Sequence, residues 1–302
     1  MSPVILVAGG SGFIGSAAVR RLIARGEDVA VMTAHPERSA RRIGGMGARV
    51  VPGDVQHPAS LGPAVSEARV VVQTLTFPTF PVEKPSRGYT FEEYEHLGTQ
   101  RLVQAAGAAG VRKFVYCSGV GVGPDAPSVW FRAKWAGEKA IEAAGLPHAI
   151  IRPSWAYGPG DRALNRIARF ARYGPAVPVI GNGEQRLQPV FVNDVAEALA
   201  QAAMEDGPQG VYEIGGPDVL TMNEVLRTML AVMGKRRPLV HFPPWVPKAA
   251  GWCVQWLPSP PLSPDAVDFA TADALADTTA LLHEFDLRLT AFRDGLSTYL
   301  AG

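Results

Sequence analysis

The chain has 302 residues, of which 47% are hydrophobic and 19% are charged, and its formal net charge is +1. That length is enough for one large domain or two with a full core, and the near-zero charge argues against a nucleic-acid partner. The two cysteines are too few for a disulfide framework, the first residues lack the basic leader of a signal peptide, and no apolar run is long enough to cross a bilayer. We therefore expect a soluble, cytoplasmic protein.

The first fifteen residues predict a strand, a glycine turn and a helix. The apolar run 3–8 is typical of a buried parallel strand, and an amphipathic pattern begins at Phe13. In that order, Gly9 permits a tight turn, Gly12 lets the backbone approach a pyrophosphate, and Gly15 lets the helix pack on the strand. The amides at the helix start would meet the phosphate charge. The sequence thus predicts a dinucleotide site made by Gly9, Gly10, Ser11, Gly12, Phe13, Ile14 and Gly15. The alternative is a packing turn that binds no ligand.

The second predicted strand, 28–33, ends without the acidic residue that usually holds the ribose hydroxyls of NAD. Thr33 stands in that place, so the carboxylate that would repel a 2′-phosphate is absent. His35, Arg38 and the arginines at 41–42 could supply positive charge to such a phosphate. We therefore expect NADP(H) to be favoured over NAD(H). The alternative is that these arginines only solvate the next helix.

Two further strand ends are expected at the same crevice. Strand 48–51 is followed by Asp54, which could accept a hydrogen bond from the adenine amino group, and by Val55, which could pack beside the ring. The alternative role of Asp54 is to form a turn or to cap the next short helix. Strand 69–73 runs into Thr74, which should pass close to the nicotinamide ribose.

The following segments keep the alternation of strand and helix. They are a proline-rich loop at 78–87, a helix over 91–109, a strand at 113–117, a helix over 129–144, and a strand at 148–152 that ends in Pro153. The helix over 129–144 carries Trp130, Lys134 and Glu138 on one face. Lys134 then either binds the nicotinamide ribose, which we favour, or is a surface lysine paired with Glu138.

Beyond residue 160 the alternation weakens. We expect a doubly wound parallel α/β core over 1–160 and a small, mainly substrate-binding α/β region over 161–302, with segments around 188–204 returning to the core.

Capping residues predict two helix starts in this second region. Asn193 and Asp194 predict the N-cap of a helix over 195–204. Thr221 and Glu224, three residues apart, predict a capping box.

The stretch 241–264 combines many prolines with three tryptophans, Trp245, Trp252 and Trp256. We expect it to form a wall or lid of a substrate pocket, because half-buried aromatic residues there need no partner. The alternative is a peripheral contact with a membrane or another protein.

Several motifs together resemble a known superfamily. They are Gly9–Gly15, Gly53-Asp54-Val55, Gly98-Thr99, Arg152-Pro153 with Tyr157-Gly158-Pro159, and the run 188–196. This set is similar to the extended and atypical short-chain dehydrogenases/reductases, which include NAD-dependent epimerases and dehydratases. Within them it is most similar to the NDUFA9-like branch, named after an accessory subunit of respiratory complex I. The resemblance implies a seven-stranded parallel Rossmann sheet, a small C-terminal domain and an NAD(P) site, to which we also assign Lys134 and Pro153.

The chain departs from that superfamily at the catalytic positions. Active members have a tyrosine four residues before the helix lysine, and here that position is Trp130. Their serine position corresponds to Gly119, with Ser118 one place away. An indole N–H donates a hydrogen bond but exchanges no proton near neutral pH. The usual alcohol and carbonyl chemistry therefore cannot be carried over.

Two functions remain open. In the first, the protein is an NAD(P)H-dependent reductase of an apolar carbonyl or activated double bond, with Lys134 or a water that it holds as proton donor, as in the similar isoflavone-reductase-like branch. Its small-molecule pocket would be lined by Phe77, Tyr89, Trp130, Trp155 and Tyr157. In the second, NADP(H) is bound but not turned over, and the protein is a scaffold, a sensor or a respiratory-complex accessory-type protein.

Other chemistries are disfavoured. The six histidines fall at no metal-ligand spacing, so no metal site is expected. Cys117 is interpreted as a small buried hydrophobe rather than a reactive thiol. Tyr89, Tyr94, Tyr116 and Tyr157 are alternative acids that no spacing selects.

Overall fold

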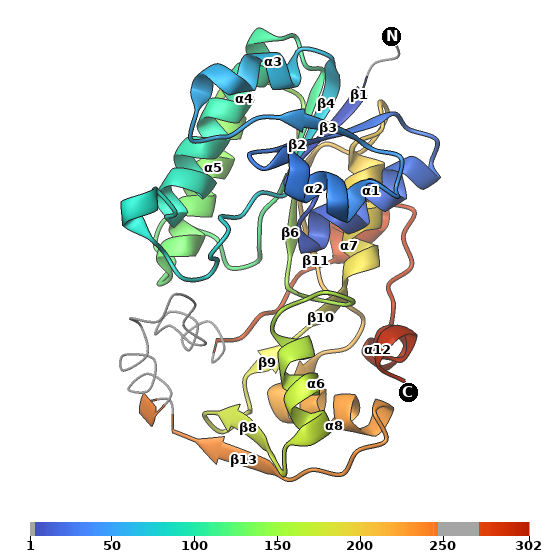
Figure 1. Cartoon of the computed structure of the whole chain (residues 1–302). Helices are drawn as coiled ribbons and strands as arrows, with labels where there is room; N and C mark the ends of the chain where they lie inside the picture. The colour runs from blue at the N-terminus through green and yellow to red at the C-terminus, as the bar shows by residue number, and fades with distance from the viewer. Residues whose placement is uncertain (1–3, 244, 247–271, 302) are drawn as a thin grey trace.

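The computed structural model describes residues 4–243, 245–246 and 272–301, and these form two lobes (Figure 1). The larger lobe is built on a seven-stranded sheet of order β11-β6-β5-β4-β1-β2-β3, in which every pairing is parallel. Its strands are β1 (Val4–Ala8), β2 (Val29–Thr33), β3 (Arg49–Pro52), β4 (Ala68–Gln73), β5 (Lys113–Cys117), β6 (His148–Pro153) and β11 (Gly210–Ile214). The predicted doubly wound Rossmann sheet is confirmed.

Helices cover both faces of this sheet, which is why the central strands β1 and β5 are buried along their whole length. On one face lie α1 (Phe13–Ala24), α7 (Val192–Ala202) and α11 (Thr279–Glu284). On the other lie α3 (Leu61–Val65), α4 (Gly98–Ala108) and α5 (Val129–Ala143). A shorter helix, α2 (Pro36–Ile43), packs beside β3.

The strand order reverses at β1, which lies between β2 and β4. In open α/β sheets, ligands bind outside the carboxyl ends of the strands at such a reversal. The glycine turn follows β1 and Thr74 follows β4, so both segments lie at this position.

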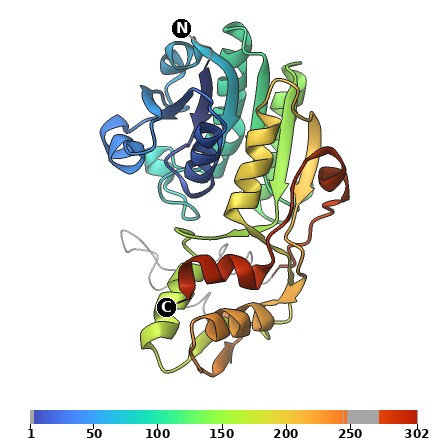
Figure 2. The ribbon, with the colours of Figure 1, turned by 90° about the vertical axis from the view of Figure 1, so that its right-hand side faces the viewer.

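In the described part of the chain, the smaller lobe contains short paired strands and helices (Figure 2). The pairs are β7 (Trp155–Tyr157) with β10 (Pro189–Phe191), β9 (Arg186–Leu187) with β12 (Leu220–Thr221), and β8 (Val177–Ile180) with β13 (Leu239–Phe242). The helices are α6 (Leu164–Tyr173), α8 (Met222–Val232) and α12 (Phe292–Leu300), the last of which packs on α8. The capping box of Thr221 and Glu224 at the start of α8 is confirmed.

The chain returns to the large lobe after building much of the small one. The helix α7 packs on α1, and β11 completes the sheet beside β6. The prediction that Asn193 and Asp194 cap this helix is wrong: α7 begins at Val192. The Asp194 carboxylate instead accepts hydrogen bonds from the backbone N–H and the hydroxyl of Thr290, because a distant segment supplies better donors than the local amides.

The helix predicted over 91–109 is two elements. A π-helical stretch, η3 (Glu92–Leu97), precedes α4. The wider backbone brings the carbonyl of Glu95 so close to Gly137 of α5 that a Cβ on Gly137 would collide with it. A π-helix is rare and frequently marks a functional site.

In the part of the chain that the structure describes, no helix is long and apolar enough to cross a membrane. Most of the stretch 241–264 lies outside the described residues, including Trp252 and Trp256.

Candidate functional site

The glycine turn after β1 has the shape of a phosphate cradle. Gly9 has φ +84°, and a Cβ there would meet the carbonyl oxygen of Thr74 at 2.8 Å. A Cβ on Gly15 would collide with the carbonyl of Gly9 and lie 2.5 Å from the Thr74 hydroxyl. Only glycine fits at these two positions, because the turn is tight and α1 approaches β1 and β4 closely.

The start of α1 is available to an anion. Its N-cap residue is the exposed Gly12, no side chain caps the first amides, and the first turn contains no acidic residue. An uncapped helix start attracts negative charge through its free N–H groups and the helix dipole. The residues 9–15 therefore fit a dinucleotide pyrophosphate. Thr74 closes the cradle from β4, where its amide and hydroxyl both donate to Ala8 O, at 2.8 and 3.2 Å.

Hydroxyl groups and arginines gather at the end of β2. Thr33 Oγ1 lies 2.9 Å from Ser39 Oγ, which donates to Ser11 Oγ at 3.2 Å. Arg42 donates to the carbonyl of Ser11 at 3.2 Å, and this joins α2 to the glycine turn. His35 is exposed and donates its amide to Thr33 Oγ1 at 3.1 Å. Arg38 is also exposed here. These hydroxyl and guanidinium groups could donate hydrogen bonds to a phosphate.

Asp54 and Val55, the two residues predicted after β3, both make contacts within the protein. The Asp54 carboxylate accepts from the backbone N–H of Gln56 at 3.0 Å, and its other oxygen lies 3.0 Å from His57 Nδ1. This is the turn-forming role that competed with adenine binding. Val55 is buried and packs against Gly98 of α4.

A buried carboxylate, Glu95, occupies the region of the expected catalytic residues. Glu95 has no exposed surface and lies between β5 and α5. Lys134 Nζ donates to it at 3.0 Å, and Trp130 Nε1 and the Tyr116 hydroxyl both donate to it at 3.2 Å. Lys134 Nζ also donates to the carbonyl of Cys117 at 3.1 Å and lies 3.5 Å from the Tyr116 hydroxyl. Three oxygens of the protein thus surround the ammonium group.

These contacts, together with burial, shift the pKa values of Lys134 and Tyr116. Burial alone would lower the pKa of Lys134, but the paired Glu95 carboxylate outweighs it and holds the pKa above its usual value. Burial also raises the pKa of Tyr116 far above that of a free phenol. Groups with such raised pKa values are poor proton donors near neutral pH. The surface-lysine interpretation of Lys134 is wrong, because the residue is 3% exposed and Glu138 pairs instead with Arg152.

The residues expected to line a substrate pocket do not form one group. Phe77 is buried and packs edge-on against Phe91 and Tyr94, and the half-buried Trp130 packs against Phe80. Tyr157 is also fully buried, far along the chain in the other core. Its hydroxyl donates to the carbonyl of Phe292 at 3.3 Å, and burial raises its pKa. Neither Phe77 nor Tyr157 therefore has surface with which to line an open pocket. Tyr89 and Trp155 are partly exposed.

The carboxyl end of β5 presents two small side chains. Ser118 is 7% exposed, and within the described residues its hydroxyl oxygen has no hydrogen-bond partner. Cys117 is buried, and this raises the pKa of its thiol to about 11, which disfavours the reactive thiolate. Pro153, at the end of β6, accepts a hydrogen bond from the amide of Val120 at 3.0 Å.

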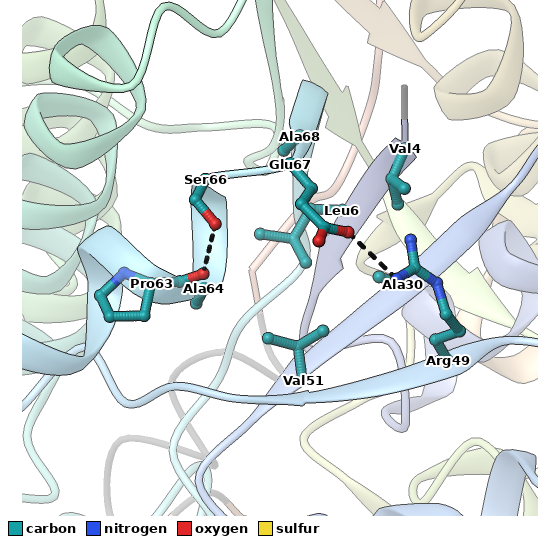
Figure 3. Close-up of a pocket in the computed structure, with 10 residues that line it drawn as sticks. All are labelled: Val4, Leu6, Ala30, Arg49, Val51, Pro63, Ala64, Ser66, Glu67 and Ala68. Atoms are coloured by element: carbon teal, nitrogen blue, oxygen red, sulfur yellow. Dashed lines mark hydrogen bonds and ion pairs between the residues drawn. The ribbon is translucent and has the colours of Figure 1, made fainter. Parts of the chain in front are cut away.

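A small cavity of about 150 Å³ lies elsewhere, at the amino ends of the strands (Figure 3). Its lining includes Val4 of β1 and Ala68 of β4, and Arg49 pairs with Glu67 at its rim at 3.1 Å. It lies at the sheet edge opposite the glycine turn, so it is no part of the candidate site. In the described residues, no group of three or more His, Cys, Asp or Glu side chains could hold a metal ion.

Comparison with known proteins agrees with this geometry. Residues 5–215 match the NAD dependent epimerase/dehydratase family. The chain belongs to that family. The resemblance to the NDUFA9-like branch is confirmed as well. The chain is 32% identical over 295 residues to the mitochondrial NADH dehydrogenase (ubiquinone) 1 alpha subcomplex subunit 9 of Arabidopsis thaliana, with 92% of this chain and 72% of that protein covered.

Another similar protein has the name of an enzyme. The 2-alkyl-3-oxoalkanoate reductase of Stenotrophomonas maltophilia (strain K279a) is 28% identical over 267 residues, which cover 77% of this chain and 76% of that one. Among solved structures, the crystal structure of gox2253 aligns with a TM-score of 0.78 at 24% identity, covering 98% of this chain and 96% of that one. That likeness extends the shared fold across both lobes.

Sequence reasoning missed Glu95, although the sequence contains a signal for it. Phe91, Glu95, Gly98 and Leu102 follow helical spacing, so the carboxylate falls within an apolar stripe. A buried carboxylate is almost always paired. On the next helix, the buried face of α5 contains Lys134, which is the cation that Glu95 requires.

Proposed function

We propose that this protein binds NADP(H) at the glycine turn and holds it without the tyrosine-dependent proton transfer of active relatives. The observation that carries the proposal is the buried Glu95 carboxylate, which engages both Lys134 and the indole N–H of Trp130. Trp130 and Lys134, at the tyrosine and lysine positions, thereby use their N–H groups in hydrogen bonds within the protein. The bound nucleotide would then have a structural or sensing role.

Residues of the large lobe would hold the nucleotide at three points. The amides of residues 9–15 would bind the pyrophosphate, as the open start of α1 favours. Thr33, Arg38 and Arg42 would bind a 2′-phosphate, because a carboxylate is lacking at the end of β2 and donors are gathered there. The nicotinamide ring, when bound, supplies a hydride. The residues around it determine whether an acceptor is reached and a proton is delivered.

The Arabidopsis relative supports this reading, since its name is that of a subunit of an assembly rather than of a separate enzyme. A protein partner is the corresponding expectation for this chain.

A reductase is the second candidate. It is favoured by the Ser118 hydroxyl, which is buried at the end of β5 with no protein partner among the described residues, and by the reductase among the relatives. In this hypothesis, an apolar carbonyl or activated double bond would be reduced at the carboxyl end of β5, beside Ser118.

The choice of nucleotide is tested by calorimetry with NADPH and NADH. We expect tighter binding of NADPH, and we expect Arg42→Ala to weaken NADPH by about tenfold or more while leaving NADH little changed, since a charge-assisted hydrogen bond contributes about 1.5–3 kcal/mol. Thr33→Asp should reverse the preference by repelling the 2′-phosphate. Arg112→Ala, an exposed change beside Glu205, is the control that should alter neither affinity. Equal affinities in the wild-type chain would contradict the assignment.

Turnover is tested separately on protein loaded with NADPH. A panel of a 3-oxoacyl ester, an enone, an aldehyde and a quinone is added, and the absorbance of NADPH is followed against a protein-free control. We expect no oxidation above the control. Oxidation that is lost in Lys134→Ala and retained in Trp130→Phe would establish the reductase and refute the silent role.

A further inference from the structure

The charge of the chain is distributed unevenly. The segments 162–183 and 225–243 together contain eight Lys and Arg residues and no Asp or Glu, although the whole chain has 29 basic and 28 acidic residues. The remainder therefore holds 21 basic and 28 acidic residues, a net charge of −7. Both segments belong to the small lobe, where they form α6, β8, β13 and most of α8.

These basic segments adjoin in space. The strand β13 runs beside β8, with Phe242 opposite Ile180, and α6 packs on β8. Arg237 donates to the carbonyl of Ala171 at 3.3 Å, which fixes the turn before β13 against the end of α6. Figure 1 shows α6, β8 and β13 together at the end of the molecule away from the large sheet.

Exposed aromatic side chains lie on these elements or just beyond them. Within the described residues, the aromatic members of the exposed large hydrophobic set are Phe170 at 50% exposure, Tyr173 at 81%, Phe242 at 40% and Trp245 at 69%. Two of them belong to α6, whose opposite side buries Leu164, Ala168 and Ala171. The outer side of α6 thus presents aromatic rings among arginines, with no acidic residue in the helix.

We propose that this surface docks the protein on an anionic lipid bilayer. We call it the basic aromatic face and define it by Arg169, Phe170, Arg172, Tyr173 and Arg236, which are all exposed. Lipid phosphates would supply negative charge to Arg169, Arg172 and Arg236, since basic residues near a membrane surface favour binding to anionic lipid. Aromatic rings beside them enter the headgroup region, where amphipathic side chains are favoured.

The shape of the basic aromatic face, as well as its charge, favours a lipid bilayer over a nucleic acid. A single-stranded nucleic acid is bound by a charged groove whose aromatic rings stack on successive bases. Here the rings of Phe170 and Tyr173 stand on the outer side of a helix. This arrangement suits contact with an extended surface.

The experiment is sedimentation of the full chain with two kinds of vesicle, pure phosphatidylcholine and equal parts phosphatidylcholine and phosphatidylglycerol. We expect binding to the anionic vesicles alone, weakening as salt is raised because the Debye length falls from about 10 Å at 0.1 M to about 3 Å at 1 M. Arg169→Glu with Arg172→Glu should weaken it by about tenfold or more. Phe170→Ser with Tyr173→Ser should weaken it while leaving the salt dependence.

A matched control reverses the same number of charges on the large lobe, with Arg20→Glu and Arg288→Glu, two exposed arginines that should leave vesicle binding within about twofold of the wild-type chain. Far-UV circular dichroism and NADPH affinity check each variant, so a failure of the cofactor proposal is seen separately. No binding to anionic vesicles would overturn the docking proposal. Equal loss in the control, or tight binding to poly(U) without vesicle binding, would overturn it too.

Discussion

Glu95 shows how one buried side chain can decide the chemistry of a site. Its carboxylate is completely shielded from solvent, which is very costly for a charge unless hydrogen bonds and an opposite charge compensate. Lys134 supplies the charge, and Trp130 and Tyr116 supply further donors. These residues hydrogen-bond to one another, and in the proposed silent role the same contacts would withhold the donors from a substrate.

Glu95→Gln should destabilise the protein by about 3–5 kcal/mol, because it leaves the Lys134 ammonium buried without its counter-charge. The free energy of unfolding is measured by urea denaturation. The control is Glu92→Gln in the same π-helical stretch, where the carboxylate is 60% exposed and pairs with His96, and about 1 kcal/mol or less is expected. Combining Glu95→Gln with Lys134→Met should cost less than the sum of the single changes. Strict additivity would mean that the two side chains do not depend on each other.

At the scale of elements, the contact between η3 and α5 holds this network together. The carbonyl of Glu95 lies against Gly137, one helical turn beyond Lys134. The absence of a side chain at Gly137 therefore allows the π-helical stretch to approach α5 closely enough for the ion pair to form.

Gly137→Ala should be destabilising although alanine is the better helix former. Overpacking costs about 1–3 kcal/mol, which outweighs a gain in helix propensity of about 1 kcal/mol at most. Gly107→Ala in α4 is the matched control, because its Cβ would find only Leu146 Cδ1 at 3.9 Å, so that variant should be neutral or slightly more stable. Urea midpoints of the two variants test this. A stable Gly137→Ala protein would show that η3 can move away without cost.

The elements near the glycine turn were predictable because their signals are local. The apolar run of β1, the glycine spacing and the apolar pattern of α1 fall within twenty-four residues. The start of α7 and the partner of Lys134 could not be predicted in this way, because each depends on a residue far away in the sequence. Thr290 draws Asp194 away from capping, and Glu95 lies 39 residues before Lys134. Periodicity identifies a buried face but does not name the group that meets it.

At the scale of the whole molecule, the lobes are not consecutive pieces of chain. The large lobe takes α7 and β11 from residues beyond 160, and α7 makes an extensive contact with α1. Arg21 of α1 and Arg25, which follows the last residue of that helix, both pair with Glu197 of α7. The expected return around 188–204 is part of this arrangement, which continues through β11.

A fragment of residues 1–160 should therefore fail to fold. It would lack β11, leaving the backbone of β6 as an open strand edge, and it would expose the apolar side of α1. Far-UV circular dichroism and gel filtration would show loss of structure or aggregation, whereas the full chain gives a single folded peak. A monomeric, cooperatively unfolding fragment would demonstrate that the first six strands are self-sufficient.

The position of α12 affects how the protein matures during synthesis. Its residues Phe292 and Leu296 belong to the same buried cluster as Tyr157 and Val190, and the Tyr157 hydroxyl donates to the carbonyl of Phe292. Domains usually fold as they leave the ribosome, at about 5–20 residues per second. Here the small lobe must wait about 7–27 seconds after Tyr157 is made before Phe292 is even polymerised. During that interval the apolar surfaces of the small lobe would be exposed. We therefore expect chaperones to bind the nascent chain mainly through this lobe.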